Sequence, residues 1–212
     1  MIHSKEELQF YLDADKFALG IQKKKPSFFG NPIWKFQIAL RKCEYYNNKN
    51  SIVDKIMLKK HRFLKNKLGQ RLGFDIKEGV FGAGLRINHF GNIVAGGKVG
   101  RWCDIHQGVN IGQTNPTKRI KGEKYNPTIG DNVWIGPGVK IYGNINIGSQ
   151  VQIGANAVVG KSFDENVTIA GVPAKIIRNI GTAGVDVSSS VNRSRNFFIK
   201  HPNHIKFNTT SS

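Results

Sequence analysis

An aliphatic residue returns at every sixth position through two stretches of the chain, and this period limits the fold more than any other feature. The first series runs from Phe81 to Ile111 and the second from Ile129 to Val159. A helix repeats near every 3.6 residues and a strand every two, so a strict period of six fits neither alone. It fits short strands joined by tight turns, with one inward aliphatic side chain per strand and glycine at the corners. The sequence therefore predicts a parallel β-helix over residues 73–180.

The segments outside the repeat have different patterns. Residues 1–72 predict an α-helical region, because Ser4 and Glu7 form a capping box and the turn cluster NNKNS at 47–51 precedes a basic helix over residues 52–72. Residues 113–127 are polar, basic and free of the period, which indicates a loop that leaves the coil. Residues 181–212 are rich in Ser, Asn and Thr, and we expect a flexible C-terminal tail there.

The charge of the chain, +18 with an isoelectric point near 10.1, allows several partners. Nucleic acid, an anionic membrane face and anionic small molecules compete with an ordinary solvated surface. No RNP, zinc-finger or helix-turn-helix pattern accompanies the charge, so we expect no nucleic acid as a partner. The basic helix over 52–72 suits either peripheral contact with the anionic inner membrane face or packing on its own domain, and we favour packing.

The cellular compartment follows from what the sequence lacks. No apolar run approaches the roughly 20 residues of a membrane span, and the first residues carry no apolar signal segment. Cys43 and Cys103 lie far apart in the sequence, and Cys103 falls at an inward repeat position typical of a reduced core residue. We expect a cytoplasmic protein, with membrane association on the cytoplasmic side left open.

Two segments of the repeat resemble a known family. The run IGDNVWIGPGVKIYGNINIGSQVQIGANAVVGKSF and the later AGVPAKII are similar to the C-terminal half of hexapeptide-repeat acyltransferases. The preceding DIKEGVFGAGLRINHFGNIVAGG resembles the serine acetyltransferase-like branch, which includes sugar O-acetyltransferases of surface-polysaccharide assembly. The resemblance covers about half the chain. It implies a left-handed parallel β-helix, a homotrimer with active sites between subunits, acetyl-CoA as co-substrate and direct transfer without an acyl-enzyme.

The resemblance also supplies candidate catalytic residues. Acetyl transfer to a hydroxyl needs a base, and histidine has a pKa near 6.5 that suits proton acceptance at neutral pH. His89 occupies the family's base position, and Asp75 falls where the family places the carboxylate that orients this histidine. Without the resemblance, His89 is an ordinary corner histidine and Asp75 a turn residue.

The predicted acceptor site departs from serine acetyltransferases. Those enzymes resemble R-H-P before the repeat resumes, whereas this chain has Tyr125, Asn126 and Pro127. Asn88 stands where they have an aspartate that attracts the substrate ammonium. Both charges that would recognise a zwitterion are missing, and an aromatic ring can stack on a sugar, so we expect a carbohydrate acceptor. His106 is a further substrate-contact candidate, or a surface corner histidine.

The predicted donor site follows the coil edge. Small residues let the pantetheine arm approach the backbone, and cations meet the phosphates. The positions that match the family's acetyl-CoA site are Gln113, Gly136, Pro137, Gly138, Gly154, Ala155, Gly171, Val172, Pro173, Lys175 and Arg178. A backbone N–H near Gln113 or Gly112 is the expected oxyanion donor. No metal site is expected.

The main functional prediction is an acetyl-CoA-dependent O-acetyltransferase that modifies a sugar hydroxyl of a surface polysaccharide or its precursor. The alternative is a serine O-acetyltransferase. A metal-dependent hydratase is less favoured because it needs about three converging histidines, and only His89 and His106 lie in the coils. A non-catalytic scaffold is the remaining class.

Overall fold

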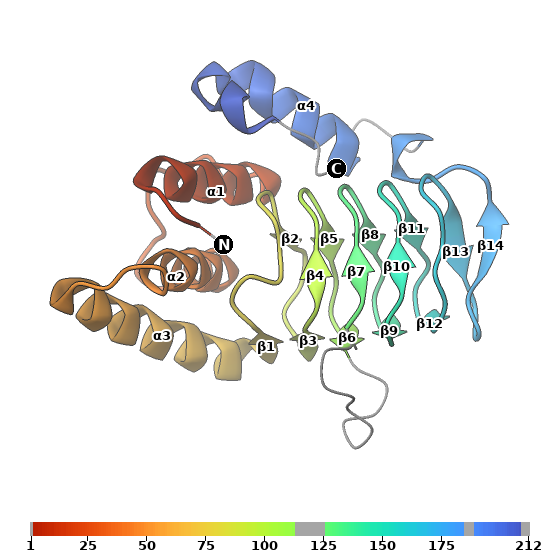
Figure 1. Ribbon diagram of the computed structural model, residues 1–212, viewed down its shortest axis with the longest axis horizontal. Helices are drawn as coiled ribbons and strands as arrows, with labels where there is room; N and C mark the ends of the chain where they lie inside the picture. Colours follow the sequence, from red (N-terminus) through yellow and green to blue (C-terminus); the bar gives the residue numbers. More distant parts are fainter. Residues whose placement is uncertain (1, 113–125, 185–188, 209–212) are drawn as a thin grey trace.

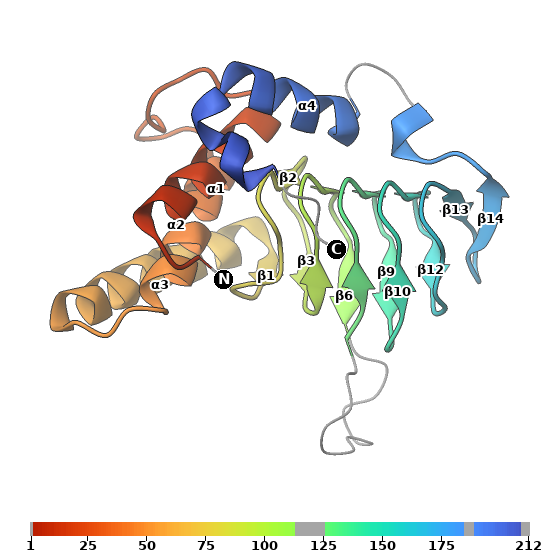
Figure 2. The same ribbon diagram turned by 45° about the horizontal axis from the view of Figure 1, so that its top comes forward.

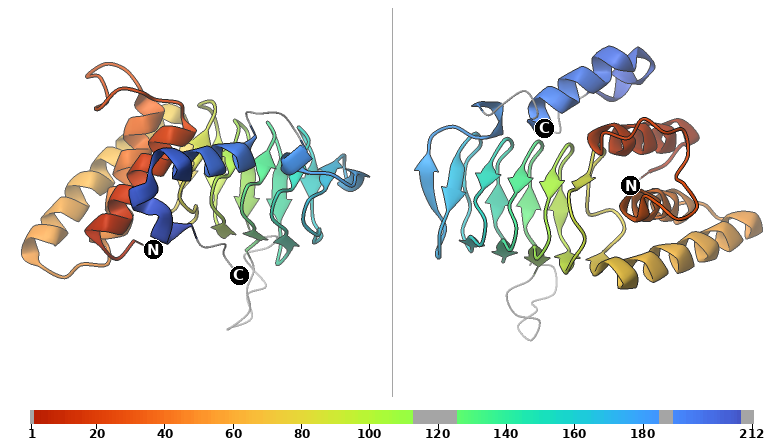
Figure 3. Two further views of the ribbon diagram at one scale, coloured as in Figure 1. Left: turned by 90° about the horizontal axis from the view of Figure 1, so that it is seen from above. Right: turned by 180° about the vertical axis from the view of Figure 1, so that it is seen from behind.

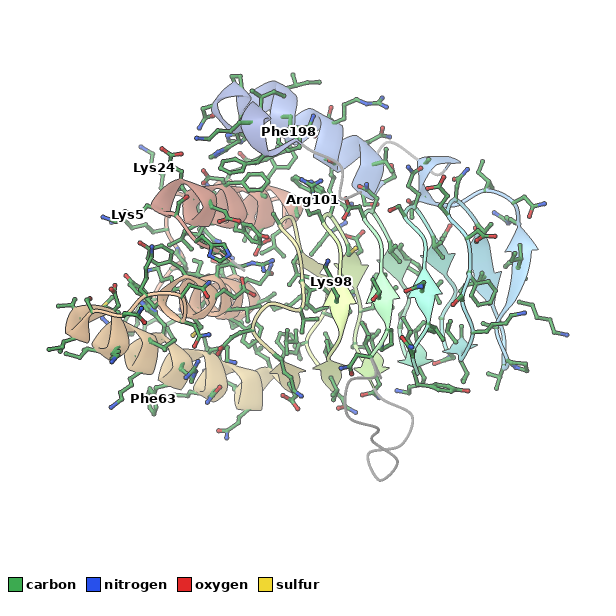
Figure 4. The ribbon with its side chains drawn as sticks, in the orientation of Figure 1. Lys5, Lys24, Phe63, Lys98, Arg101 and Phe198 are labelled. Atoms are coloured by element: carbon green, nitrogen blue, oxygen red, sulfur yellow. The ribbon has the colours of Figure 1, made fainter. Side chains whose placement is uncertain are left out.

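The computed structural model describes residues 2–112, 126–184 and 189–208. Three helices come first: α1 (Lys5–Ala18), α2 (Pro32–Tyr46) and α3 (Ile52–Leu72). The hydroxyl of Ser4 accepts a hydrogen bond from the Glu7 backbone N–H, so Ser4 caps α1 as expected. The Glu7 carboxylate accepts from the backbone N–H of His3, so the reciprocal half of the capping box is made one residue earlier than expected. Helix α3 ends at Gly73, whose φ of 76° lies in the left-handed region that glycine adopts without strain. Phe63 on α3 is 70% exposed (Figure 4), so this helix does not bury its whole apolar face as expected.

The β region winds into a coil with three faces (Figure 1). The first sheet contains β1 (Phe74–Ile76), β3 (Ile93–Ala95), β6 (Asn110–Gly112), β9 (Lys140–Tyr142) and β12 (Val158–Val159). The second contains β4 (Lys98–Val99), β7 (Thr128–Ile129) and β10 (Asn146–Ile147). The third contains β2 (Arg86–Ile87), β5 (Asp104–Ile105), β8 (Trp134–Ile135), β11 (Gln152–Ile153), β13 (Thr168–Ala170) and β14 (Lys175–Arg178).

All paired strands in this coil are parallel except the last pair, in which β14 runs antiparallel to β13 and closes the far end. The predicted parallel β-helix with N-terminal helices is therefore confirmed, and its handedness remains a prediction. The inward aliphatic residues are buried and form one core that continues into α2 through Phe36 and Leu40. Each inward position of the coil is shielded from water in the same way, so each requires an apolar side chain. The sequence therefore shows an apolar residue at every sixth position.

Helices α1 and α2 cover the open end of the coil (Figures 1 and 2). The first coil has no preceding strand to pair with, so its backbone groups need other partners. Arg41 donates to the carbonyl oxygens of Phe81 and Gly82 at 2.7 Å each. Asp15 Oδ1 accepts from the backbone N–H groups of Gly84 and Leu85 at 2.9 Å each. Buried side chains of the helices thus replace the missing coil.

The C-terminal residues differ from the flexible tail that their composition suggested. Helix α4 (Ser190–Lys200) and the short 3₁₀ helix η2 (Pro202–Phe207) lie along the coil and reach α1 (Figure 3). Phe197 is fully buried, with its ring 5.2 Å from Trp102, and Phe198 lies between α4 and α1 (Figure 4). The ring of Phe207 stacks on Phe10 at 4.7 Å. Three aromatic side chains outweigh a polar average composition, because each buries a large apolar area.

No helix within the described ranges is long and apolar enough to cross a membrane.

Candidate active site

One corner of the coil, where the third sheet turns into the first, gathers most of the predicted site residues. The inward isoleucines Ile87, Ile105, Ile135, Ile153 and Ile169 are paired in register along the third sheet. The residues that follow them therefore stack in a column, which consists of Asn88, His106, Gly136, Gly154 and Ala170. We call this the corner column.

A two-residue bulge carries His89 out of this corner. Ile87 pairs with Ile105 and Ala95 pairs with Ile111, yet eight positions separate Ile87 from Ala95 whereas six separate Ile105 from Ile111. Ladder hydrogen bonds flank the extra residues, because Asn88 donates to Ile105 at 3.0 Å and Gly108 donates to Gly91 at 3.0 Å. His89 and Phe90 lie between these bonds and are both exposed. The predicted base is thus presented to solvent by an insertion in the first coil.

The next corner compensates for this insertion. Only four positions separate Ala95 from Val99, whereas six separate their register partners Ile141 and Ile147. Gly97 makes the short corner with a φ of 89°, and a Cβ there would lie 2.5 Å from the Pro127 carbonyl oxygen. The tight turn therefore requires glycine. The bulge at His89 adds two residues and the corner at Gly97 omits two, so the spacing of apolar residues in the sequence remains six and shows neither irregularity.

His106 lies in the corner column, one coil beyond His89. Their ring centroids are 6.2 Å apart, and the His106 ring is 4.9 Å from Trp134. Its Nδ1 lies 2.9 Å from the carbonyl oxygen of Ile135. Burial lowers the pKa of His106, although the Ile135 carbonyl opposes this shift. The imidazole is therefore held neutral in one tautomer near pH 7, with a proton on Nδ1.

Asp75, the predicted partner of His89, forms no hydrogen bond with it in the described part of the chain. It is exposed on β1, in the first sheet, with Val94 as its register partner. Among the described residues, no hydrogen bond joins its carboxylate to His89. The orienting role of Asp75 stays a prediction.

The predicted donor residues continue along the same corner. A Cβ on Gly136 would lie 2.8 Å from the Ile153 carbonyl oxygen, and one on Gly154 would lie 2.9 Å from the Ala170 Cβ. Stacking of the coils therefore already demands glycine at both positions. Gly138 has a φ of 73°, and a Cβ there would overlap the Asn156 side chain. Pro137, Ala155 and Gly171 each follow a member of the corner column.

The last predicted donor residues lie at the closed end of the coil. The Val172–Pro173 peptide bond is cis, and Val172 is exposed. Lys175 and Arg178 are exposed on β14, where they lie open to an anionic ligand. Of the two expected oxyanion donors, Gln113 lies outside the described residues and Gly112 is the last residue of β6.

The predicted acceptor residues are divided between two corners. Asn126 lies where the first sheet turns into the second, and its Oδ1 is 3.8 Å from the Cβ position of Gly96. His89 and Asn88 lie at the other end of the first-sheet strands. Tyr125 falls outside the described residues. One chain thus does not bring Asn126 to His89.

Two features of the structure, the position of Gln107 and the cap formed by Arg41 and Asp15, were not predicted from the sequence. Gln107 follows His106 in the second coil and has a buried amide oxygen, Oε1, that accepts no hydrogen bond from the part of the chain that the structure describes. The aligned coils could have suggested it, because Gln107 lies one coil beyond the His89 bulge. The cap formed by Arg41 and Asp15 left no periodic signal. Among the described residues, no three His, Cys, Asp or Glu side chains converge as a metal site would require.

Comparison with known proteins places the fold in one family. Residues 126–161 match the family model for bacterial transferase hexapeptide (six repeats). The serine acetyltransferase of Staphylococcus xylosus is 31% identical over 181 residues, which is 84% of this chain and 77% of that protein. The serine acetyltransferase of Synechococcus elongatus is 38% identical over 112 residues, 51% of this chain and only 44% of that protein.

A solved structure agrees with these relatives. The serine acetyltransferase from Brucella abortus strain S19 superposes with a TM-score of 0.61 at 30% identity, over 83% of this chain and 71% of that one. The chain belongs to the hexapeptide-repeat acyltransferases, and within them its homologues are serine acetyltransferases. The predicted enzyme class, an acyltransferase that uses acetyl-CoA, is confirmed.

The main functional prediction, a sugar acceptor in surface-polysaccharide synthesis, is wrong. Relatives 31–38% identical to this chain are named serine acetyltransferases, which favours the alternative. The error came from two missing charges, at Asn88 and Tyr125. An absent cation or carboxylate removes one way of recognising a zwitterion, but it does not identify a sugar, because neutral donors and acceptors also bind charged groups. The comparisons also give no support to membrane contact.

Proposed function

We propose that this protein transfers the acetyl group of acetyl-CoA to the hydroxyl of L-serine. The observation that carries the proposal is the bulge that presents His89 at the corner column, in a chain with serine acetyltransferase relatives over most of its length. An alcohol becomes a sufficient nucleophile towards a thioester when a base removes its proton as it attacks. His89 is exposed and so accessible to both substrates.

The reaction balances with one base. The serine oxygen bonds to the thioester carbonyl carbon while its proton passes to His89. The C–S bond then breaks, and His89 gives the same proton to the departing thiolate of CoA, so the products are O-acetylserine and the free thiol, and His89 is neutral again. The pantetheine arm would follow the corner column towards β14, where Lys175 and Arg178 supply positive charge for the phosphates of acetyl-CoA.

We infer that the active unit is a homotrimer with a left-handed coil. His89 and Asn126 lie at different corners of one chain, so a neighbouring copy is needed to place both beside one acceptor. Sedimentation should give a mass about three times 23.6 kDa. Mixing His89→Ala subunits with Asn126→Ala subunits should restore part of the lost activity, since some interfaces then hold two intact residues. No recovery after mixing, with a trimer present, would show that one chain holds the complete site.

The assay for the activity follows thiol release from acetyl-CoA in the presence of L-serine and detects O-acetylserine by mass spectrometry. His89→Asn should lower the turnover roughly 10²- to 10⁴-fold, because general-base catalysis contributes that much. His3→Asn is the matched control, since His3 is an exposed histidine that precedes α1 and does not belong to the corner column. Thiol release that does not rise above the rate of acetyl-CoA hydrolysis when serine is added would refute the proposal.

A further inference from the structure

Two amide side chains at the His89 corner each have a buried polar atom that forms no hydrogen bond with any described residue. These atoms are Nδ2 of Asn88, a donor, and Oε1 of Gln107, an acceptor. Folded proteins pair nearly all buried polar atoms, because an unpaired one loses its water without compensation. Two such atoms on adjacent coils of one corner are therefore suited to a ligand that carries both an acceptor and a donor.

Both side chains lie beside the proposed base. Asn88 precedes His89 directly and donates its backbone N–H to Ile105, so it stacks on His106. Gln107 lies beneath Gly91, whose Cβ position is 3.6 Å from the Gln107 Cβ. The bulge formed by His89 and Phe90 therefore lies next to His106 and Gln107 of the following coil.

His106 adds a second acceptor to the same place. The Ile135 carbonyl can only accept, so the 2.9 Å contact requires a proton on Nδ1 of His106. Its Nε2 then carries a lone pair, and no described residue donates a hydrogen bond to it. Trp134 packs against the ring at 4.9 Å and restrains it.

The nearby carboxylate is not available for this task. Asp104 is buried on β5 and is bonded to Arg193 of α4, with Arg86 at 4.0 Å. The acceptors that face the corner are therefore neutral.

We propose that Gln107 Oε1 and His106 Nε2 accept hydrogen bonds from the ammonium group of an amino-acid acceptor, while Asn88 Nδ2 donates to its carboxylate. This assignment rests on the proposed function and extends it, since it names the residues that separate an amino acid from a simple hydroxy acid. An ammonium group has three N–H donors, and two neutral acceptors pair with two of them without the desolvation cost of a buried carboxylate.

The test uses the full chain and two inhibitors that each keep half of serine. Ethanolamine has the ammonium and hydroxyl groups, and 3-hydroxypropionate has the carboxylate and hydroxyl groups. Gln107→Met preserves length and shape without the acceptor, and Gln107→Glu replaces the amide by a carboxylate. We expect Gln107→Met to raise the KM for L-serine and the inhibition constant of ethanolamine roughly 10- to 100-fold, as for a lost hydrogen bond to a charged group. In Gln107→Met, the KM for acetyl-CoA and the inhibition constant of 3-hydroxypropionate should stay within about twofold of the wild-type values. Gln107→Glu should keep the wild-type affinity for ethanolamine, because a carboxylate also accepts hydrogen bonds from an ammonium group.

A second variant, His106→Phe, keeps the ring against Trp134 and should show the same selective loss for ethanolamine. Equal losses for both inhibitors would overturn the inference, because they would indicate only a structural role. The inference would also be overturned if ethanolamine inhibited the Gln107→Glu variant more weakly than it inhibits the Gln107→Met variant. These outcomes require acetyl transfer to L-serine by the wild-type enzyme, so absence of that turnover marks failure of the proposed function instead.

Discussion

Arg41 and Asp15 form a buried ion pair, with Nε and Oδ2 2.8 Å apart, where the helices meet the first coil. Both residues also bond backbone groups of residues 81–85, so the pair acts as a cap on the open end of the β-helix. Burial by itself lowers the pKa of Arg41, but the carboxylates of Asp15 and Glu44 keep this pKa above its usual value. The guanidinium therefore stays charged within the fold.

Removal of this cap should destabilise the whole chain. Arg41→Met leaves Asp15 and Glu44 as uncompensated buried charges, and breaking such a pair costs about 3–5 kcal/mol. Urea unfolding should show this loss as a lower midpoint. Glu6→Gln is the control, because Glu6 pairs with Lys206 at an exposed site and should leave the midpoint unchanged. A midpoint for Arg41→Met equal to that of Glu6→Gln would contradict the assigned cap.

His61 should make the stability sensitive to acid. Burial, with smaller contributions from Lys42 and Lys60, lowers the pKa of His61 to about 4. The unfolded chain binds this proton near pH 6.5, so the free energy of unfolding should be unaffected by His61 above that pH. It should fall on the order of 1–2 kcal/mol as the pH drops from 6.5 towards 4, because the unfolded state takes up the proton first.

The check for His61 is urea unfolding across this pH range. His61→Phe should remove much of the slope, since phenylalanine keeps the stacking on Tyr46, seen at a ring distance of 5.7 Å, and does not titrate. His3→Phe, at an exposed position, should leave the slope as it is. An unchanged slope in His61→Phe would assign the acid sensitivity to other groups.

Two glycines with similar backbone angles provide a test of close packing. Gly84 has a φ of 79°, and a Cβ there would lie 2.5 Å from the Trp102 ring, whereas Gly20 has a φ of 69° and nothing within 4 Å. Gly20→Ala should cost about 1 kcal/mol from the left-handed angle alone. Gly84→Ala should cost about 1–3 kcal/mol more, because it also overpacks a buried ring. Equal losses would show that the ring moves freely.

The C-terminal helix should depend on one aromatic residue. Phe197→Ala removes a fully buried ring from the contact of α4 with α1 and Trp102, and such truncations cost about 3–5 kcal/mol. Hydrogen exchange should then show that α4 has lost its protection while the coil keeps its own. Ile199→Ala, at a position 70% exposed on the same helix, should leave α4 protected. Protection of α4 that survives Phe197→Ala would mean that other contacts hold it.

The sequence by itself determined the coil, because each buried aliphatic residue repeats an identical environment and so leaves a period that can be counted. The motifs around His89 and Gly136 likewise indicated the enzyme class. The acceptor was misjudged, since an alignment of single positions shows which charges are missing but not which neutral groups replace them. Gln107 and the fixed tautomer of His106 become meaningful only when adjacent coils are stacked.

Only the tertiary structure decided how the coil begins, how it is flanked and how His89 is presented. The pairing of Arg41 with Asp15 joins positions with no common period, and the docking of Phe197 depends on a partner surface far away in the sequence. The bulge at His89 was hidden because the short corner at Gly97 restores the register, so the sum of two opposite irregularities still equals six per strand. A period in the sequence gives the spacing of residues along the chain. The site depends on which residues lie in register on neighbouring coils, and the period does not give that.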